Sequence, residues 1–252
     1  MKIAISGKGG VGKTTLAGTL ARLFARKGYD VLAIDADPSM NLASALGIKN
    51  PPCPLIEFKE LIDERAGGPA GFFKLNPKVD DIVENFGVTG PDNVKLLVMG
   101  TIERGGSGCM CPASSFLKAL LRHVILKRNC VVILDMEAGV EHLGRGITKG
   151  IDYMLIVVEP GARSIETAGR IAELARQIDI RKFGAVINKA GDEVTEIEER
   201  LKEYSLPVIG VIPYDSTLVQ ADMENISPMD SNGAALSAIE EIFGKISGGE
   251  LS

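Results

Sequence analysis

The sequence has few of the features on which disulfide-rich, membrane-bound or nucleic-acid-binding proteins depend. Only four cysteines and two histidines occur in 252 residues, with no low-complexity tract, charge block or internal repeat. The apolar run at the N-terminus is too short for a signal peptide or a membrane span. A net charge of −5 argues against a nucleic-acid-binding surface. We therefore expect a cytoplasmic protein with no nucleic-acid partner and no membrane contact.

The chain does contain short apolar runs that alternate with amphipathic segments. The runs occupy residues 2–6, 31–35, 94–100, 130–135, 153–159, 183–189 and 207–213. Residues 14–28 and 114–127 place their apolar side chains at helical spacing. This alternation predicts an α/β fold with a mostly parallel sheet and helices on both faces. We expect a single domain over residues 1–252, with an irregular Pro/Gly-rich insertion at about 49–92.

The strongest functional signal is "GKGGVGKT" at Gly7–Thr14, which matches G-x-x-x-x-G-K-[ST] between a predicted strand and a predicted helix. In such a loop, backbone N–H groups surround the phosphates and the helix N-terminus adds a partial positive charge. Lys13 would reach the β- and γ-phosphates, and the Thr14 hydroxyl would bind Mg²⁺. The predicted nucleotide-binding residues of this segment are Gly9, Gly10, Val11, Gly12, Lys13, Thr14 and Thr15.

An additional lysine, Lys8, makes "KGGVGKT" resemble the deviant Walker A family of P-loop ATPases, which includes the nitrogenase iron protein, MinD and ParA. The resemblance extends over nearly the whole chain. It implies a nucleotide-dependent homodimer in which Lys8 reaches the partner's nucleotide and stabilises γ-phosphate charge, as an arginine finger does. The plainer alternative is that Lys8 is a solvated loop lysine.

Two acidic segments complete the predicted phosphate site. In "DADPSMNL", Asp37 matches the family position that orients or deprotonates the attacking water, and Asp35 is expected to support the loop. Asn41 stands where the iron protein has an aspartate, so no metal contact is assigned to it. In "VVILDMEAG", Asp135 would hold Mg²⁺ through water, and Gly139 could bring its N–H to the γ-phosphate.

The resemblance also implies a base site. "INKA" and "VIPYD" look like the family's base-recognition elements, in which Asn188 would read the adenine edge and Pro213 would flank the ring. No guanine-specificity motif of the N-K-x-D type is present. The resemblance alone implies ATP and ADP as the nucleotides, and hydrolysis of ATP to ADP and phosphate as the reaction.

Cys109 and Cys111 in "RGGSGCMCPAS" form a C-x-C pair on an expected loop. A disulfide between them would close a strained ring, so we set it aside. Zn²⁺ generally takes four ligands, and a two-fold dimer would bring two such pairs together. Tetrahedral sulfur coordination suits Zn²⁺, whereas planar coordination suits Ni²⁺. The alternative is that the pair is incidental. Cys130 is expected to be a buried core thiol and Cys53 a loop residue.

The surroundings of the pair favour metal binding. "GGSGCMCPASSFLKALLRH" and "DMEAGVEHLGRG" resemble the CooC-type accessory ATPases that help insert nickel into carbon monoxide dehydrogenase, and their relatives serving acetyl-CoA synthase. The resemblance implies Ni²⁺ or Zn²⁺ at the dimer interface and a nickel enzyme as client. Alternatives are a positioning ATPase of the MinD or ParA type and an iron–sulfur electron-transfer ATPase. His123 is expected to be packed or at an interface. His142 is expected to have a plain loop role, with sensing of the nucleotide state as the alternative.

Overall fold

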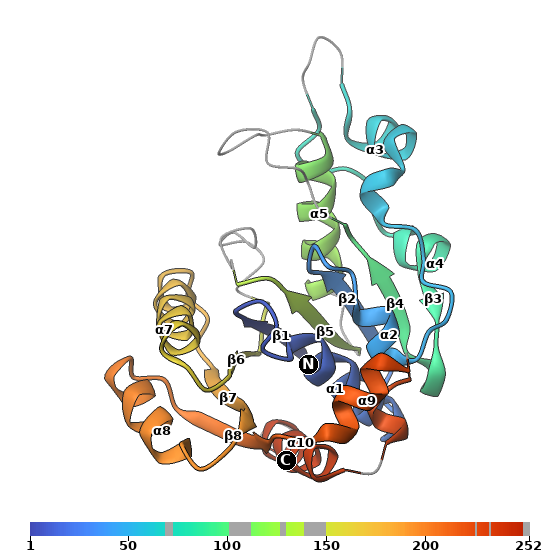
Figure 1. Ribbon diagram of the computed structural model, residues 1–252. Helices are drawn as coiled ribbons and strands as arrows, with labels where there is room; N and C mark the ends of the chain where they lie inside the picture. Colours follow the sequence, from blue (N-terminus) through green and yellow to red (C-terminus); the bar gives the residue numbers. More distant parts are fainter. Residues whose placement is uncertain are drawn as a thin grey trace.

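The computed structural model describes residues 1–68, 73–100, 112–126, 130–138, 150–224, 226–231 and 233–248 (Figure 1). An eight-stranded sheet with the order β3-β4-β2-β5-β1-β6-β7-β8 forms its centre. Every neighbouring pair is parallel except β3–β4. The strands are β1 (Lys2–Gly7), β2 (Val31–Ala36), β3 (Val88–Thr89), β4 (Lys95–Val98), β5 (Val131–Met136), β6 (Tyr153–Val158), β7 (Phe183–Ala190) and β8 (Val208–Pro213). The predicted α/β fold is thus confirmed.

The strands are continuous apolar runs because helices cover both faces of the sheet. Successive side chains alternate between two cores: Ile3 and Ile5 of β1 belong to one, and Ala4 belongs to the other. The Ile3 core is covered by α1 (Lys13–Arg26), α2 (Leu42–Leu46) and α10 (Ala234–Ser247). The Ala4 core is covered by α3 (Lys59–Ala66), α4 (Ile82–Phe86), α5 (Pro112–Leu126), α7 (Ala162–Gln177) and α8 (Val194–Glu203).

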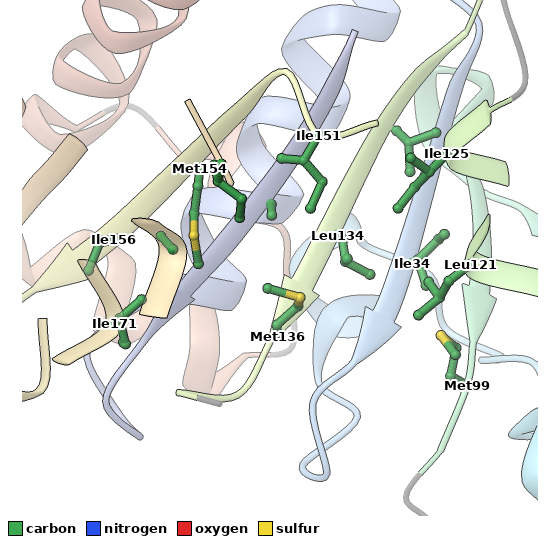
Figure 2. Close-up of a cluster of buried hydrophobic side chains, with 14 of the residues drawn as sticks. Ile34, Met99, Leu121, Ile125, Leu134, Met136, Ile151, Met154, Ile156 and Ile171 are labelled. Carbon is green, nitrogen blue, oxygen red and sulfur yellow. The ribbon is translucent and has the colours of Figure 1, made fainter. Parts of the chain in front are cut away.

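Figure 2 shows how the second core joins distant parts of the chain. Ile34 of β2 and Leu134 of β5 lie near Leu121 of α5, and Ile156 of β6 lies near Ile171 of α7. Each of these side chains is buried. At roughly 25 cal/mol per Å² of buried apolar surface, such side chains supply most of the driving force for folding. This core therefore fixes the strands whose ends carry the predicted site.

The segment predicted as an irregular insertion is more ordered than expected. Residues 49–92 contain α3 and α4, two short 3₁₀ turns at Leu55–Glu57 and Pro91–Asn93, and the edge strand β3. Ile62 and Ile82 are buried in the α5 core. Gly67 and Gly87 directly follow α3 and α4, and Pro91 begins the second 3₁₀ turn, so these residues mark the ends and starts of short elements.

The topology brings three loops together at the carboxyl edge of the sheet. β1 lies between β5 and β6, and β5 lies between β1 and β2. The register pairs Ile5 with Asp135 and Asp35 with Asp135. Ligands of open α/β sheets bind outside the carboxyl ends of the strands. The loops that follow β1, β2 and β5 therefore meet where a ligand is expected.

In the part of the chain that the structure describes, no helix has both the length and the apolar character needed to cross a bilayer.

Candidate active site

The loop after β1 has the backbone shape of a phosphate cradle. Gly10 and Gly12 have φ angles of 81° and 96°, which L side chains rarely adopt. A Cβ on Gly12 would also collide with the side-chain amide of Asn188. That amide donates from Nδ2 to the Val11 carbonyl at 2.8 Å, and Lys189 Nζ donates to the Gly10 carbonyl at 2.7 Å. The end of β7 thus holds the loop in place.

Lys13, the first residue of α1, lies beneath this loop. Its side chain is only 5% exposed, and Nζ lies 3.4 Å from the Lys8 carbonyl oxygen and 3.4 Å from Asp37 Oδ2. The opposite charge of Asp37 therefore balances an ammonium that would otherwise be buried alone. A lysine held in this position can neutralise the charge of a bound phosphate.

Asp37 is kept in its ionised form. Its Oδ1 accepts hydrogen bonds from the Ser39 N–H at 2.9 Å and the Ser39 hydroxyl at 2.6 Å. Burial alone would raise the pKa of Asp37, but the Ser39 hydrogen bonds and Lys13 outweigh it and hold the pKa below its ordinary value. An ionised carboxylate beside a phosphate-binding lysine can orient a water molecule. That role for Asp37 stays a prediction.

Asp35 holds the same loop from below. Oδ1 accepts from the Asp37 N–H at 3.2 Å and Oδ2 from the Leu42 N–H at 2.9 Å. Burial raises the pKa of Asp35 to about 6, although both backbone hydrogen bonds lower it. Asp35 therefore supports the loop that carries Asp37, as expected from the sequence.

Asp135, near the end of β5, is fully buried. Neither carboxyl oxygen has a hydrogen bond of good geometry within the described ranges. Burial raises the pKa of Asp135 to about 7; Thr14 partly lowers it, and Asp35 raises it further. An orphaned carboxyl group beside a phosphate loop is a costly arrangement for the empty protein. Oxygen ligands of this kind fit Mg²⁺, so Thr14 and Asp135 suit the predicted cation.

A cavity of about 670 Å³ opens above these groups, a size typical of small-molecule sites. The phosphate loop and Asp37 line its floor, and Asn188, Pro213 and Tyr214 line the wall beyond them. Tyr214 is 64% exposed at the rim. Pro213 and Asn188 thus lie where the prediction places the base. Their contacts with adenine stay a prediction, since the Asn188 nitrogen is bound to the loop.

Four of the residues named in the sequence analysis are not placed by the structure. Cys109, Cys111, Gly139 and His142 lie outside the described residues. Cys130 is buried, as expected, and Lys2 Nζ donates to its carbonyl at 2.9 Å and lies 3.1 Å from its sulfur.

Cys53 is exposed, which agrees with a loop position, and His123 is half-buried on α5. No group of three or more His, Cys, Asp or Glu side chains able to hold a metal occurs among the residues that the structure places. The predicted C-x-C metal site therefore remains a prediction.

The sequence analysis missed the charged pair Glu159 and Lys189, of which Lys189 lines the cavity. Glu159 follows β6, and its carboxylate pairs with both Lys8 and Lys189, at 3.9 and 2.9 Å. The signal was available, because Glu159 ends the apolar run 153–159 just as Asp135 ends the run before it. What the run does not reveal is the strand order that places Glu159 beside the phosphate loop.

Together, the parallel sheet and the glycine loop define a P-loop nucleotide-binding protein. The model of the "CobQ/CobB/MinD/ParA nucleotide binding domain" family matches residues 2–229. The chain belongs to this family, and it is an ATPase that uses ATP and Mg²⁺.

Relatives and solved structures agree with this assignment. The chain is 46% identical to an uncharacterised ATP-binding protein of Methanocaldococcus jannaschii, over 98% of this chain and 97% of the relative. It is 44% identical to the carbon monoxide dehydrogenase accessory protein CooC of Rhodospirillum rubrum, over 93% and 91% of the two chains. MinD of Aquifex aeolicus, solved with MinC, has a TM-score of 0.74 at 23% identity, over 100% and 97%. The resemblance to CooC and to the deviant Walker A ATPases is therefore confirmed.

Proposed function

We propose that the protein is an ATP-driven nickel-insertion factor for a carbon monoxide dehydrogenase or an acetyl-CoA synthase. The observation that carries the proposal is the 44% identity to CooC, a carbon monoxide dehydrogenase accessory protein, along 93% of this chain. In this proposal the protein works as a homodimer, and the Cys109 and Cys111 pairs of two copies form a shared metal site. The nickel is cargo, delivered to the client enzyme.

The chain's own residues would carry out hydrolysis by positioning and charge neutralisation. Backbone N–H groups of the loop and the Lys13 ammonium bind the phosphates. Asp37 orients the water that attacks the γ-phosphate, while Asp35 and Ser39 hold the loop and the carboxylate of Asp37 in place. Mg²⁺, held by Thr14 and by Asp135 through water, would supply positive charge to the β- and γ-phosphates.

The contrast between the two loop lysines supports a dimer. Lys13 is buried and paired within its own subunit, whereas the Lys8 side chain is 42% exposed at the mouth of the cavity. Lys13 already supplies positive charge to the nucleotide of its own subunit, so Lys8 is not needed there. An exposed lysine can reach a nucleotide in a facing subunit, and this would make ATP part of the dimer contact.

Coordination chemistry links that contact to the metal. Cys109 and Cys111 offer two thiolates, and two copies offer four, which suits Zn²⁺ in tetrahedral geometry or Ni²⁺ in planar geometry. Coupling is reciprocal, so ATP that favours the dimer should tighten metal binding, and metal should tighten the dimer.

The test is equilibrium dialysis against Ni²⁺ or Zn²⁺ with and without a non-hydrolysable ATP analogue, with oligomeric state measured by analytical ultracentrifugation. We expect one metal ion per dimer, bound at least tenfold more tightly with the analogue. The Cys109→Ser/Cys111→Ser variant should lose that binding.

Cys53→Ser is the matched control, because Cys53 is exposed and lies far from the C-x-C pair in sequence; it should bind metal as the parent protein does. Unchanged binding in the double variant would disprove the shared site. Absorbance in the visible range after anaerobic purification would favour an iron–sulfur cluster instead.

A positioning ATPase is the second candidate, because MinD shares this fold. The structure offers an argument against a lipid-binding role for α10. Its apolar residues Ile239, Ile242 and Ile246 are buried against the sheet and are not available for a bilayer. ATP-dependent sedimentation with anionic liposomes or with DNA would support this candidate.

A further inference from the structure

Glu159 connects the phosphate loop after β1 to the ends of β6 and β7, which follow β1 on one side of the sheet. β1 pairs with β6 up to Gly7 and Val157, so Glu159 projects past the point where the loop begins. β6 pairs with β7 up to Val158 and Ile187, which places Lys189 on its other side. The backbone of Glu159 is itself fixed, because its N–H donates to the buried Ser164 hydroxyl at 3.0 Å.

One carboxylate in this position serves two ammonium groups. Oε1 lies 3.9 Å from Lys8 Nζ, and Oε2 accepts a hydrogen bond from Lys189 Nζ at 2.9 Å. The Glu159 side chain is 23% exposed, and both lysines are less buried than it is, at 42% and 45% exposure. The contact of Lys189 is short and that of Lys8 is long, so the two lysines hold the carboxylate unequally.

Lys189 is held in a conformation that a lysine rarely adopts. Its φ angle of 55° lies in the left-handed region, where a side chain that is not glycine is strained. In that conformation its ammonium reaches both Glu159 and the Gly10 carbonyl, at 2.9 and 2.7 Å. Strain of this kind at a ligand site is generally maintained by the contacts it allows. The arrangement therefore couples Lys189 to the same loop that carries Lys8.

We propose that Glu159 is a positioning residue that holds Lys8 on its own subunit until a nucleotide-bound partner competes for it. Lys189 sets the strength of that hold, because it draws the carboxylate away from Lys8. When Lys8 leaves, the Glu159–Lys189 pair remains neutral and still anchors the loop. The proposal rests on the proposed function in one respect, namely the reach of Lys8 to the partner's nucleotide.

The first measurement needs no dimer. The nucleotide-free protein is treated briefly with an amine-reactive reagent, and the labelling rate of Lys8 is followed by mass spectrometry. An ammonium held against a carboxylate is screened from the reagent. Glu159→Gln should speed labelling of Lys8 about two- to fivefold, the size expected of a half-exposed ion pair. Lys189→Met should slow it, because Glu159 is then left to Lys8 alone. An unchanged rate in Glu159→Gln would overturn the proposal.

The double variant tests whether Lys189 acts by competing with Lys8 for the Glu159 carboxylate or by holding the phosphate loop through Gly10. Glu159→Gln/Lys189→Met should label at the rate of Glu159→Gln, since without the carboxylate there is nothing to compete for. If Lys189 acted only through Gly10, the double variant would behave as Lys189→Met does, and competition would be refuted. Glu166→Gln is the matched control: this exposed glutamate on α7 removes the same charge nearby and should leave the rate unchanged.

The second measurement is the dissociation constant of the dimer with a non-hydrolysable ATP analogue and Mg²⁺. Glu159→Gln should lower that constant about two- to fivefold and Lys189→Met should raise it. If the parent protein dimerises, and Lys8→Met prevents it, but the Glu159 variant changes nothing, only the present inference fails. If labelling responds as expected and no variant dimerises, the holding contact stands, and the dimer of the proposed function fails.

Discussion

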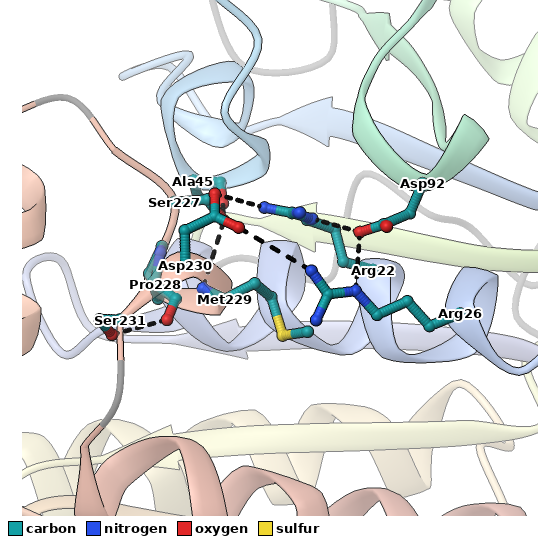
Figure 3. A network of polar contacts seen from close by, with 9 residues as sticks. All are labelled: Arg22, Arg26, Ala45, Asp92, Ser227, Pro228, Met229, Asp230 and Ser231. Carbon is teal, nitrogen blue, oxygen red and sulfur yellow. Dashed lines mark hydrogen bonds and ion pairs between the residues drawn. The ribbon is translucent and has the colours of Figure 1, made fainter.

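The two ends of helix α1 carry charged clusters that differ in whether each charged group has a partner. Near its start, Lys13 has a single ion-pair partner at 3.4 Å, and the neighbouring Asp135 has no hydrogen-bond partner in the described chain. Near its end, Arg22 is equally buried but bonds to Asp92 at 2.6 Å and to Asp230 at 2.9 Å (Figure 3). Both clusters contain a buried cation, yet only in the second does every charged group have a partner among the described residues.

The complete cluster is structural. Burial alone would lower the pKa of Arg22, but the hydrogen bonds to Asp230 and Asp92 outweigh it and raise that pKa. The partners come from segments 70 and 208 residues away in sequence, so the cluster joins the helix to the end of the insertion and to the C-terminal part of the chain. A buried charge with all its partners stabilises a fold, whereas one that lacks partners marks a place where a ligand is expected.

The largest expected effect is on catalysis at the Lys13 end of α1, where the charged cluster is incomplete. Asp37→Asn should lower the rate of ATP hydrolysis about 10²- to 10⁴-fold, because an amide cannot accept the water's proton. Affinity for ADP should change only a few-fold, since the phosphate loop is intact. Single-turnover phosphate release and ADP titration measure the two effects. Asp63→Asn, an exposed change on α3, is the control. A decrease of less than tenfold in the hydrolysis rate would show that Asp37 does not take part in the reaction.

The next effect tests the complete end. Arg22→Met should reduce the free energy of unfolding by about 3 kcal/mol, because it leaves Asp92 and Asp230 without their buried partner. Arg26 is an exposed neighbour that contacts the same carboxylates. Arg26→Met should lower the free energy of unfolding by at most about 1 kcal/mol. Urea unfolding measures both. Equal losses of unfolding free energy in the two variants would show that the burial of Arg22 contributes nothing to stability.

A third variant separates stability from function at the incomplete end. Asp135→Asn keeps the shape of the side chain but removes its capacity for charge. The nucleotide-free protein should therefore be as stable as the parent or up to about 2 kcal/mol more stable. Hydrolysis should nonetheless fall at least a hundredfold. Thermal unfolding and phosphate release provide the two measurements, and a clear loss of stability would mean that Asp135 has partners after all.

The smallest effect is the acid dependence of the complete cluster. Burial would raise the pKa of Asp92, but Arg22 and Arg26 outweigh it and hold the pKa below 3.8. A lowered pKa contributes stability that is present above the unfolded value and is lost as pH falls through the folded value.

The difference in unfolding free energy between the parent and Asp92→Asn, about 1 kcal/mol near neutral pH, should therefore shrink below about pH 4. Asn tolerates the left-handed backbone of Asp92, whose φ is 55°, so the change tests charge rather than backbone strain. A constant difference down to pH 2.5 would contradict the ion-pair explanation.

Sequence reasoning succeeded where the signal is local. The phosphate loop, the strand that precedes it and the acidic residues at strand ends each lie within a few residues, and continuous apolar runs predicted buried parallel strands. The edge strand β3 was missed because Val88–Thr89 is too short to form a pattern. Helix α4 of the insertion was missed because it has only five residues.

Long-range pairing was out of reach for a physical reason. Glu159 meets Lys8 because β6 lies next to β1, and Arg22 meets Asp230 across most of the chain. Neither contact produces a periodic pattern in the sequence, because an ion pair needs only one residue from each of two segments.

Two of the residues labelled in Figure 3, Ala45 and Pro228, also line the nucleotide cavity. Asp230 follows Pro228, which lines the cavity, and the Ser227 hydroxyl donates at 2.6 Å to the carbonyl of Ala45, another lining residue. Two lining segments are thus linked to each other by this hydrogen bond, and Asp230 links one of them to α1. Any displacement of Ala45 or Pro228 would have to break these contacts, so they favour one fixed position for this side of the cavity.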